Sequence, residues 1–196
     1  MRGKVTIVGR EAQSGAYLLR ILAAKRMAVQ FGRFRGGEAI ALPAGEYVYV
    51  GSAMGEKGAS CLARRLVRHA TRRETAPHEI RELMLAEFAR LGLGHGDLQP
   101  RGAKGLFWHV DYLLEATEVS LTHVLVLRSG RRLEKELAAL VAGQPYTSTP
   151  APGLGASDAA GDTHLFAVRG ERQGWWEALA AAVRALDDSL LTGQQG

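Results

Sequence analysis

Two tyrosines and one short stretch of helix hold the residue types that could act on a phosphate. Tyr17 ends a Gly-Ala-Tyr segment, and Tyr49 begins the segment Tyr-Val-Gly-Ser at 49–52. Arg65 and His69 are four residues apart, so a helix places them one turn apart on the same face. Arginine offers a planar fork of donors for phosphate oxygens, and tyrosine becomes a usable base beside a cation or a metal. These residues favour chemistry on a phosphodiester, although each tyrosine could also be an ordinary sheet aromatic.

The helix expected at about 61–73 has an apolar arc that suits packing on a sheet and a basic arc that suits a polyanion. A glycine-rich loop at 51–58 comes shortly before it. We expect the loop and the basic arc to hold the phosphates of a nucleic acid together. The alternative is that the arginines form only a solvated helix face and that His69 packs or caps. The expected nucleic-acid-binding residues are Gly51, Ser52, Lys57, Arg64, Arg68, Arg72 and Arg73.

The order of these segments resembles the GIY-YIG nuclease superfamily, and in particular a branch found alone or fused to an endonuclease III domain. Gly-Ala-Tyr at 15–17 stands for the GIY element, Tyr-Val-Gly at 49–51 for YIG, and the helix matches the pattern LxxRLxxH at 62–69. The resemblance runs from about residue 3 to residue 170. Its later blocks read FWHVDYL at 107–113, EKE at 134–136, GLGASD at 153–158 and THLF at 163–166.

The resemblance implies a metal-dependent DNA endonuclease that acts on damaged or branched DNA. Tyr17 or Tyr49 would activate water, Arg65 would bind the scissile phosphate, and His69 would assist. In the superfamily a glutamate on the helix after the third core strand holds Mg²⁺ or Mn²⁺. By position this glutamate is Glu136. Glu134 is the near alternative as metal ligand, and Asp111 in the FWHVDYL block is a distant alternative.

Several residues depart from the pattern of the branch. Phe107 replaces a histidine, and Lys135, Ala159 and Gly161 replace cysteines. Two other functions therefore stay open: a catalytically silent module that binds nucleic acid, and a scaffold that docks a DNA repair protein. RNA stays open as an alternative to DNA. Ser157, Asp158 and His164 suggest a loop anchor near the site, because the nucleophile-elbow pattern of a hydrolytic triad does not occur.

The composition is that of a globular protein with a mild basic excess. The 196 residues carry a net charge of +5 and a single cysteine, Cys61, which favours a reducing, cytoplasmic setting. No apolar run approaches the roughly 18 residues of a membrane span, so we expect no membrane association. We expect one α/β (α+β) domain over 1–196, with an insertion at 74–104 and a closing helix at 172–192. Its core would be a small antiparallel three-stranded sheet with extra edge strands, flanked by helices. Both phenols and the Arg65 guanidinium should then meet in an open cleft.

Overall fold

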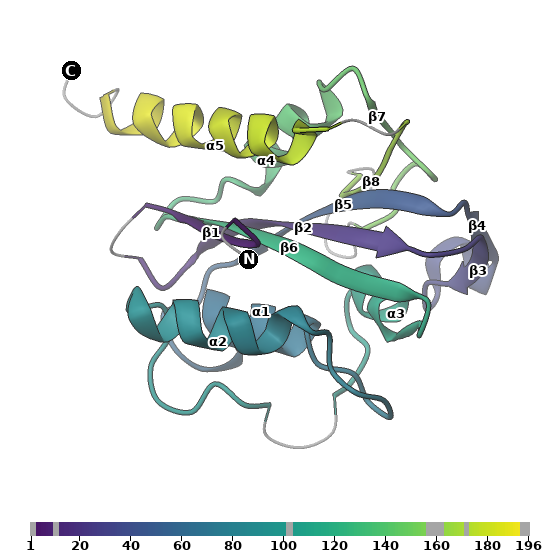
Figure 1. The fold of residues 1–196 in the computed structure, drawn as a ribbon, viewed down its shortest axis with the longest axis horizontal. Coiled ribbons are helices and arrows are strands. Elements are labelled where there is room, and N and C mark those ends of the chain that lie inside the picture. Colours follow the sequence, from purple (N-terminus) through teal and green to yellow (C-terminus); the bar gives the residue numbers. More distant parts are fainter. Residues whose placement is uncertain (1–2, 10–11, 101–103, 156–162, 171–172, 193–196) are drawn as a thin grey trace.

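A six-stranded sheet lies between two layers of helices in the computed structural model, which describes residues 3–9, 12–100, 104–155, 163–170 and 173–192 (Figure 1). Two 3-10 turns cover Phe34–Gly37 and Gly58–Ser60. The strands are β1 (Val5–Val8), β2 (Gly15–Ala23), β3 (Met27–Gln30), β4 (Ala39–Leu42), β5 (Gly45–Ala53), β6 (Val119–Arg128), β7 (Thr147–Ser148) and β8 (Leu165–Val168). The helices are α1 (Leu62–His69), α2 (Ile80–Arg90), α3 (His109–Glu115), α4 (Glu134–Ala142) and α5 (Trp175–Thr192).

The sheet has the strand order β1-β6-β2-β5-β8-β7. Its centre, β6-β2-β5, is antiparallel, which confirms the predicted three-stranded core with additional edge strands. β8 and β7 extend this pattern on one side, whereas β1 pairs with β6 in parallel, so the whole sheet is mixed. A separate ribbon of β3 and β4 lies beside α3 at one end of the molecule (Figure 1).

Both faces of the central strands are covered, which explains why β2 and β5 read as nearly continuous apolar runs. Successive side chains of a strand point to opposite faces. In β2, Tyr17 and Leu19 face the layer of α1, α2 and α3, while Ala16 and Leu18 face α4 and α5. The two hydrophobic cores that result lie on the two sides of the sheet (Figure 1).

The segment 74–104, which was expected as an insertion, contains α2. This helix belongs to the same layer as α1 and α3. Ile80, Met84 and Phe88 recur at helical spacing and are buried in the same core as Tyr17. α2 therefore completes the cover of the sheet beside α1. On the other face α5 covers residues 175–192 of the expected closing helix and buries Trp176. No helix among the described residues is long and apolar enough to cross a membrane.

Candidate functional site

The sheet register brings the two tyrosines to the same face. Tyr17 lies opposite Gly51 on β5, and Leu19 lies opposite Tyr49, so both phenol rings point toward α1. Their ring centroids are 6.5 Å apart, and the His69 ring lies 5.8 Å from Tyr17 and 6.4 Å from Tyr49. The predicted meeting of β2, β5 and α1 is therefore found in the structure.

Gly51 makes room for the Tyr17 ring. A Cβ atom at this position would lie 2.5 Å from the ring carbon and hydroxyl oxygen of Tyr17, closer than real contacts allow. Gly51 is also buried. Its role in the fold is to let Tyr17 lie flat against β5, which differs from the nucleic-acid contact that the sequence suggested.

A chain of buried hydrogen bonds leads from Tyr17 to Asp111. The Tyr17 hydroxyl lies 2.9 Å from His69 Nε2, and His69 Nδ1 lies 3.0 Å from Asp111 Oδ1. Both side chains of the histidine–carboxylate pair are 0% exposed. An ionised Asp111 can only accept, so we assign the hydrogen of His69 to Nδ1. Nε2 of the neutral ring then accepts a hydrogen bond from the Tyr17 hydroxyl.

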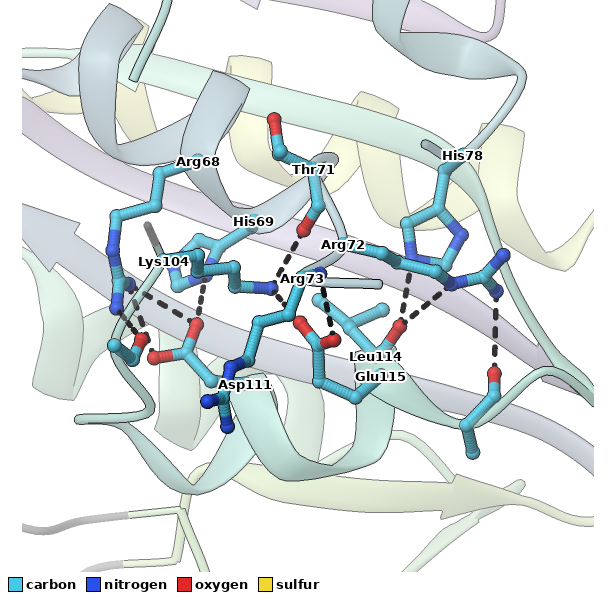
Figure 2. Close-up of polar contacts among 12 residues, drawn as sticks. Arg68, His69, Thr71, Arg72, Arg73, His78, Lys104, Asp111, Leu114 and Glu115 are labelled. Carbon is cyan, nitrogen blue, oxygen red and sulfur yellow. Dashed lines mark hydrogen bonds and ion pairs between the residues drawn. The ribbon is translucent and has the colours of Figure 1, made fainter. Parts of the chain in front are cut away.

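Asp111 is positioned by the first turn of α3. Its Oδ2 accepts hydrogen bonds from the backbone N–H groups of Phe107 and Trp108, at 3.0 and 3.1 Å. Arg68 Nη1 donates to both carboxylate oxygens, at 3.2 and 3.0 Å. Figure 2 shows Asp111 between Arg68 and His69. This carboxylate therefore ties α3 to α1 and fixes the orientation of the His69 ring.

The pKa shifts along this chain favour one proton arrangement. Burial works to raise the pKa of Asp111, but the hydrogen bond from His69, the charge of Arg68 and the N–H of Phe107 outweigh it and lower the pKa. Burial lowers the pKa of His69, against the opposing effect of Asp111. Burial raises the pKa of Tyr17 well above its usual value, although the charge of Arg65 works in the opposite direction. At neutral pH the chain therefore holds a carboxylate, a neutral imidazole and a protonated phenol.

Glu134 is the carboxylate that the fold brings to this cluster. It opens α4, and its Oε2 accepts a hydrogen bond from Ser52 Oγ on β5. Its Oε1 lies 3.1 Å from His164 Nδ1. Burial works to raise the pKa of Glu134, but the hydrogen bonds of His164 and Ser52 and the charge of Arg65 outweigh it and lower the pKa. Glu136 is exposed on α4, so the geometry favours Glu134 over the glutamate that the sequence ranked first.

A metal ion at this site would meet one partly exposed carboxylate, that of Glu134. No group of three or more His, Cys, Asp or Glu side chains within the described ranges is arranged to hold a metal ion. Mg²⁺, however, is commonly held by one or two carboxylates together with waters and substrate phosphates. Glu134 is ionised, and its side chain is 23% exposed. A hard cation with a single protein carboxylate therefore fits this site, whereas a cation that needs a full set of protein ligands does not.

Arg65 lies between the cluster and a tryptophan. Its Nη1 donates to the backbone oxygen of Ser52 at 2.8 Å, and its guanidinium carbon lies 4.1 Å from the centroid of the Trp108 ring. Among the described residues, the buried Nε of Arg65 and the buried Nε2 of His164 have no hydrogen-bond partner. Such atoms carry a desolvation cost, and each one in a native structure calls for an explanation. Both atoms belong to side chains, Arg65 and His164, that lower the pKa of Glu134.

The burial of the tyrosines differs from the open cleft that the sequence predicts. Tyr17 is 1% exposed, Tyr49 3% and His69 0%. The reason is that α1 and α3 cover this face of the sheet. The partly exposed members of the cluster include Arg65, Ser52, Glu134 and Trp108, so these residues form the surface that a ligand can reach.

The arginines of α1 and of the residues just after it have separate roles. Arg72 donates to the backbone oxygen of Leu114 (Figure 2) and to those of Ala116 and Val119, which ties the segment after α1 to the end of α3 and the start of β6. Arg68 donates hydrogen bonds to the Asp111 carboxylate and to the backbone oxygen of Gly105. Both guanidinium groups are therefore bound by groups of the protein, whereas the sequence predicted that they contact a nucleic acid. The expected residues that remain at the surface are Lys57 and Arg73, which are exposed, and Arg64, which is half-buried.

Three residues of the cluster have roles that the sequence does not predict. The sequence offers Asp111 only as a distant alternative for the metal ligand and His164 as part of a loop anchor near the site, and it gives Trp108 no role in the site. The signal was present in the FWHVDYL and THLF blocks, since both belong to the resemblance. Ser157 and Asp158 lie outside the described residues.

The family described as "Domain of unknown function DUF123" matches residues 16–187, so the chain belongs to that family. No curated protein matches the chain, and no solved structure does.

Proposed function

We propose that this member of the DUF123 family is a metal-dependent endonuclease of the GIY-YIG type that hydrolyses phosphodiester bonds in DNA. The observation that supports the proposal best is the convergence of three groups on one spot. These are the guanidinium of Arg65, the carboxylate of Glu134 and the hydrogen-bonded chain from Tyr17 through His69 to Asp111. A phosphate-binding cation, a carboxylate for a metal and a route for a proton are what such a hydrolysis requires.

Arg65 would bind the scissile phosphate. Its guanidinium is held from behind by Trp108 and by the backbone oxygen of Ser52, which limits its rotation. A fixed fork of donors can meet two phosphate oxygens at once and stabilise the charge that builds up as the bond to the leaving oxygen breaks. A lysine at this position would lack both the fork and the stacking.

Glu134 would hold Mg²⁺ or Mn²⁺. Ser52 and His164 fix its carboxylate in place, and the remaining lone pairs of its oxygens are the ones a cation would meet. The chemistry that such an ion supplies when bound is neutralisation of the phosphate charge and polarisation of a phosphoryl oxygen.

Tyr17, His69 and Asp111 would move the proton of the attacking water. The Tyr17 oxygen accepts this proton while its own proton passes to His69 Nε2, so the nucleophile is a hydroxide and His69 becomes an imidazolium. The ionised Asp111 then stabilises that cation through Nδ1–H. Because Tyr17 is 1% exposed, the water that reacts is one bound in the site rather than bulk solvent.

Cleavage assays with matched glutamate variants test this proposal. The purified protein is incubated with branched, damaged and plain duplex DNA in Mg²⁺, in Mn²⁺ and in EDTA. We expect metal-dependent nicking that R65A and E134Q abolish and that E136Q leaves unchanged, because Glu136 is exposed away from the cluster. Cleavage that survives R65A, or equal losses in E134Q and E136Q, would contradict the proposal.

The burial of both phenols favours one alternative, a module that binds nucleic acid without turnover. Such a module would show binding that weakens with salt, because contacts to phosphates release counterions. It would show no cleavage in either metal. A binding titration over a range of salt concentrations, run beside the cleavage assay, separates the two functions.

A further inference from the structure

A strip of alternating guanidinium groups and aromatic rings leads away from the candidate site. The Trp108 ring lies between two arginines, with the guanidinium carbon of Arg65 at 4.1 Å and that of Arg68 at 4.6 Å from its centroid. Arg68 also lies over the Phe107 ring, at 5.4 Å, and the Phe107 and Trp108 centroids are 6.1 Å apart. The order Arg65, Trp108, Arg68, Phe107 therefore forms a continuous path from the expected phosphate position to the surface.

Phe107 ends this strip with its ring in solvent. It is 73% exposed, the highest value among the large hydrophobic side chains of the described residues. Its backbone is nevertheless fixed, because its N–H donates to the buried Asp111 carboxylate at 3.0 Å. An exposed aromatic ring on a fixed backbone is well placed to stack on a ligand, since little entropy remains to be lost on binding.

A pocket of about 400 Å³ adjoins the Phe107 ring. Three cations line it, and two of them have partners: Arg68 is paired with Asp111, and Lys104 with Glu115. Arg64 is the third, and no hydrogen bond or ion pair is found for it within the described residues. The remaining lining residues are Gly58, Ala59, Leu98, Gln99, Pro100, Gly105 and Phe107.

We propose that this pocket, called here the Phe107 pocket, binds one unpaired nucleotide of the substrate, with the base stacked on Phe107 and a flanking phosphate near Arg64. The combination of an exposed ring with an uncompensated cation suits a ligand that is both aromatic and anionic. Stacking on aromatic side chains is the general way in which proteins hold unpaired bases. A paired base cannot take this position because its neighbours in the duplex cover its faces.

This inference rests on the proposed function and narrows it to DNA with a single-stranded or extruded nucleotide beside the cleaved bond. Branched and damaged DNA both provide such nucleotides. The strip connects the Phe107 pocket to Arg65, so the unpaired nucleotide would lie close along the strand to the phosphate that is cut.

Binding of a fluorescent base tests the proposal without any cleavage. The full chain in EDTA is titrated with a single-stranded oligonucleotide that carries 2-aminopurine, and with the same strand in a complete duplex. We expect quenching of the 2-aminopurine only in the single strand. F107A should remove the quenching and weaken single-strand binding by about 5- to 150-fold, the range seen when one stacking aromatic is truncated, with less than a twofold effect on the duplex. F107W should keep both the quenching and the affinity.

L191A serves as the matched control, because Leu191 is an exposed apolar residue (58%) on α5 and has no part in the strip. The proposal would be overturned if F107A quenched 2-aminopurine as much as the wild type does. It would also be overturned if F107A lost equal affinity for the single strand and the duplex. Cleavage without any quenching overturns the Phe107 pocket and leaves the proposed function standing. Quenching that depends on Phe107 without any cleavage supports the pocket and contradicts the nuclease.

Discussion

Replacing Asp111 by asparagine tests the buried chain most directly. Asparagine keeps the shape of the side chain and removes its charge. The Arg68 guanidinium, whose side chain is 15% exposed, then loses its anion, and the Nδ1–H of His69 loses its charged acceptor. Removing one partner of a buried ion pair costs about 3–5 kcal/mol of stability, and the partial exposure of Arg68 argues for about 3 kcal/mol. In a domain of this size that corresponds to a fall in melting temperature of about 6–12 °C.

The effect of D111N on cleavage follows from the same contacts. The amide can donate to His69 Nδ1, which would place the ring hydrogen on Nε2 and block acceptance of the Tyr17 proton. Positioned general-base catalysis contributes about 10²- to 10⁴-fold, so we expect the cleavage rate to fall within this range while binding of DNA in EDTA stays the same. Calorimetry and single-turnover cleavage measure the two effects, with D97N as the control because Asp97 is an exposed loop carboxylate.

The pH dependence of the D111N effect supplies a second check. A carboxyl whose pKa is lowered by folding adds stability above its unfolded pKa, about 4, and this stability is lost as the pH falls toward the folded value. The difference in melting temperature between wild type and D111N should therefore be constant at neutral pH and shrink below about pH 4. A D111N protein that is as stable as the wild type at pH 7, or that cleaves at the wild-type rate, would refute the reasoning.

Three further substitutions have outcomes that follow from single contacts. G51A should destabilise the protein by about 1–3 kcal/mol in urea unfolding and reduce cleavage, because the new methyl group meets the Tyr17 ring. G130A is the control, because a methyl group at Gly130 meets open space and should change neither stability nor cleavage. R72M should lower the melting temperature by several degrees without weakening DNA binding at low salt, while R73M, at an exposed position, should leave the melting temperature unchanged. Burial lowers the pKa of His78 to about 4, so wild-type stability should fall by about 3 kcal/mol from pH 6.5 to pH 4, and H78Q should flatten that fall in urea unfolding.

The elements around the site could be predicted because their signals are local. The run of apolar residues in β2 and β5 and the two arcs of α1 follow from side-chain periodicity, which depends only on neighbours in the chain. Periodicity also places Tyr17 and Tyr49 on one face once the two strands are paired. The end of α1 was less predictable: the helix ends at His69, and Arg72 just beyond it donates to the backbone oxygens of Leu114 and Ala116, more than 40 residues away.

The partners of the site residues could not be predicted in the same way. Glu134 and Glu136 are two residues apart on one helix, so no pattern decides which of them faces Ser52; the packing of α4 against β5 does. Asp111 is 42 residues from His69 in the chain. The donors that surround the Asp111 carboxylate, from Arg68, His69 and the backbone of Phe107 and Trp108, come together only when α3 packs beside α1.

The directions of the pKa shifts are compatible with a role for the buried Tyr17–His69–Asp111 chain in the proposed hydrolysis. Burial alone keeps His69 neutral, which leaves Nε2 free to accept, but it also makes the ring a weak base. Asp111 opposes that weakness, because its charge becomes most valuable at the moment when His69 gains a proton. Tyr17 need never be a stable phenolate, since its high pKa is bypassed when one proton arrives as another leaves. In the proposed hydrolysis, the same burial that would disqualify each residue as an isolated base would therefore suit the three of them as a connected relay.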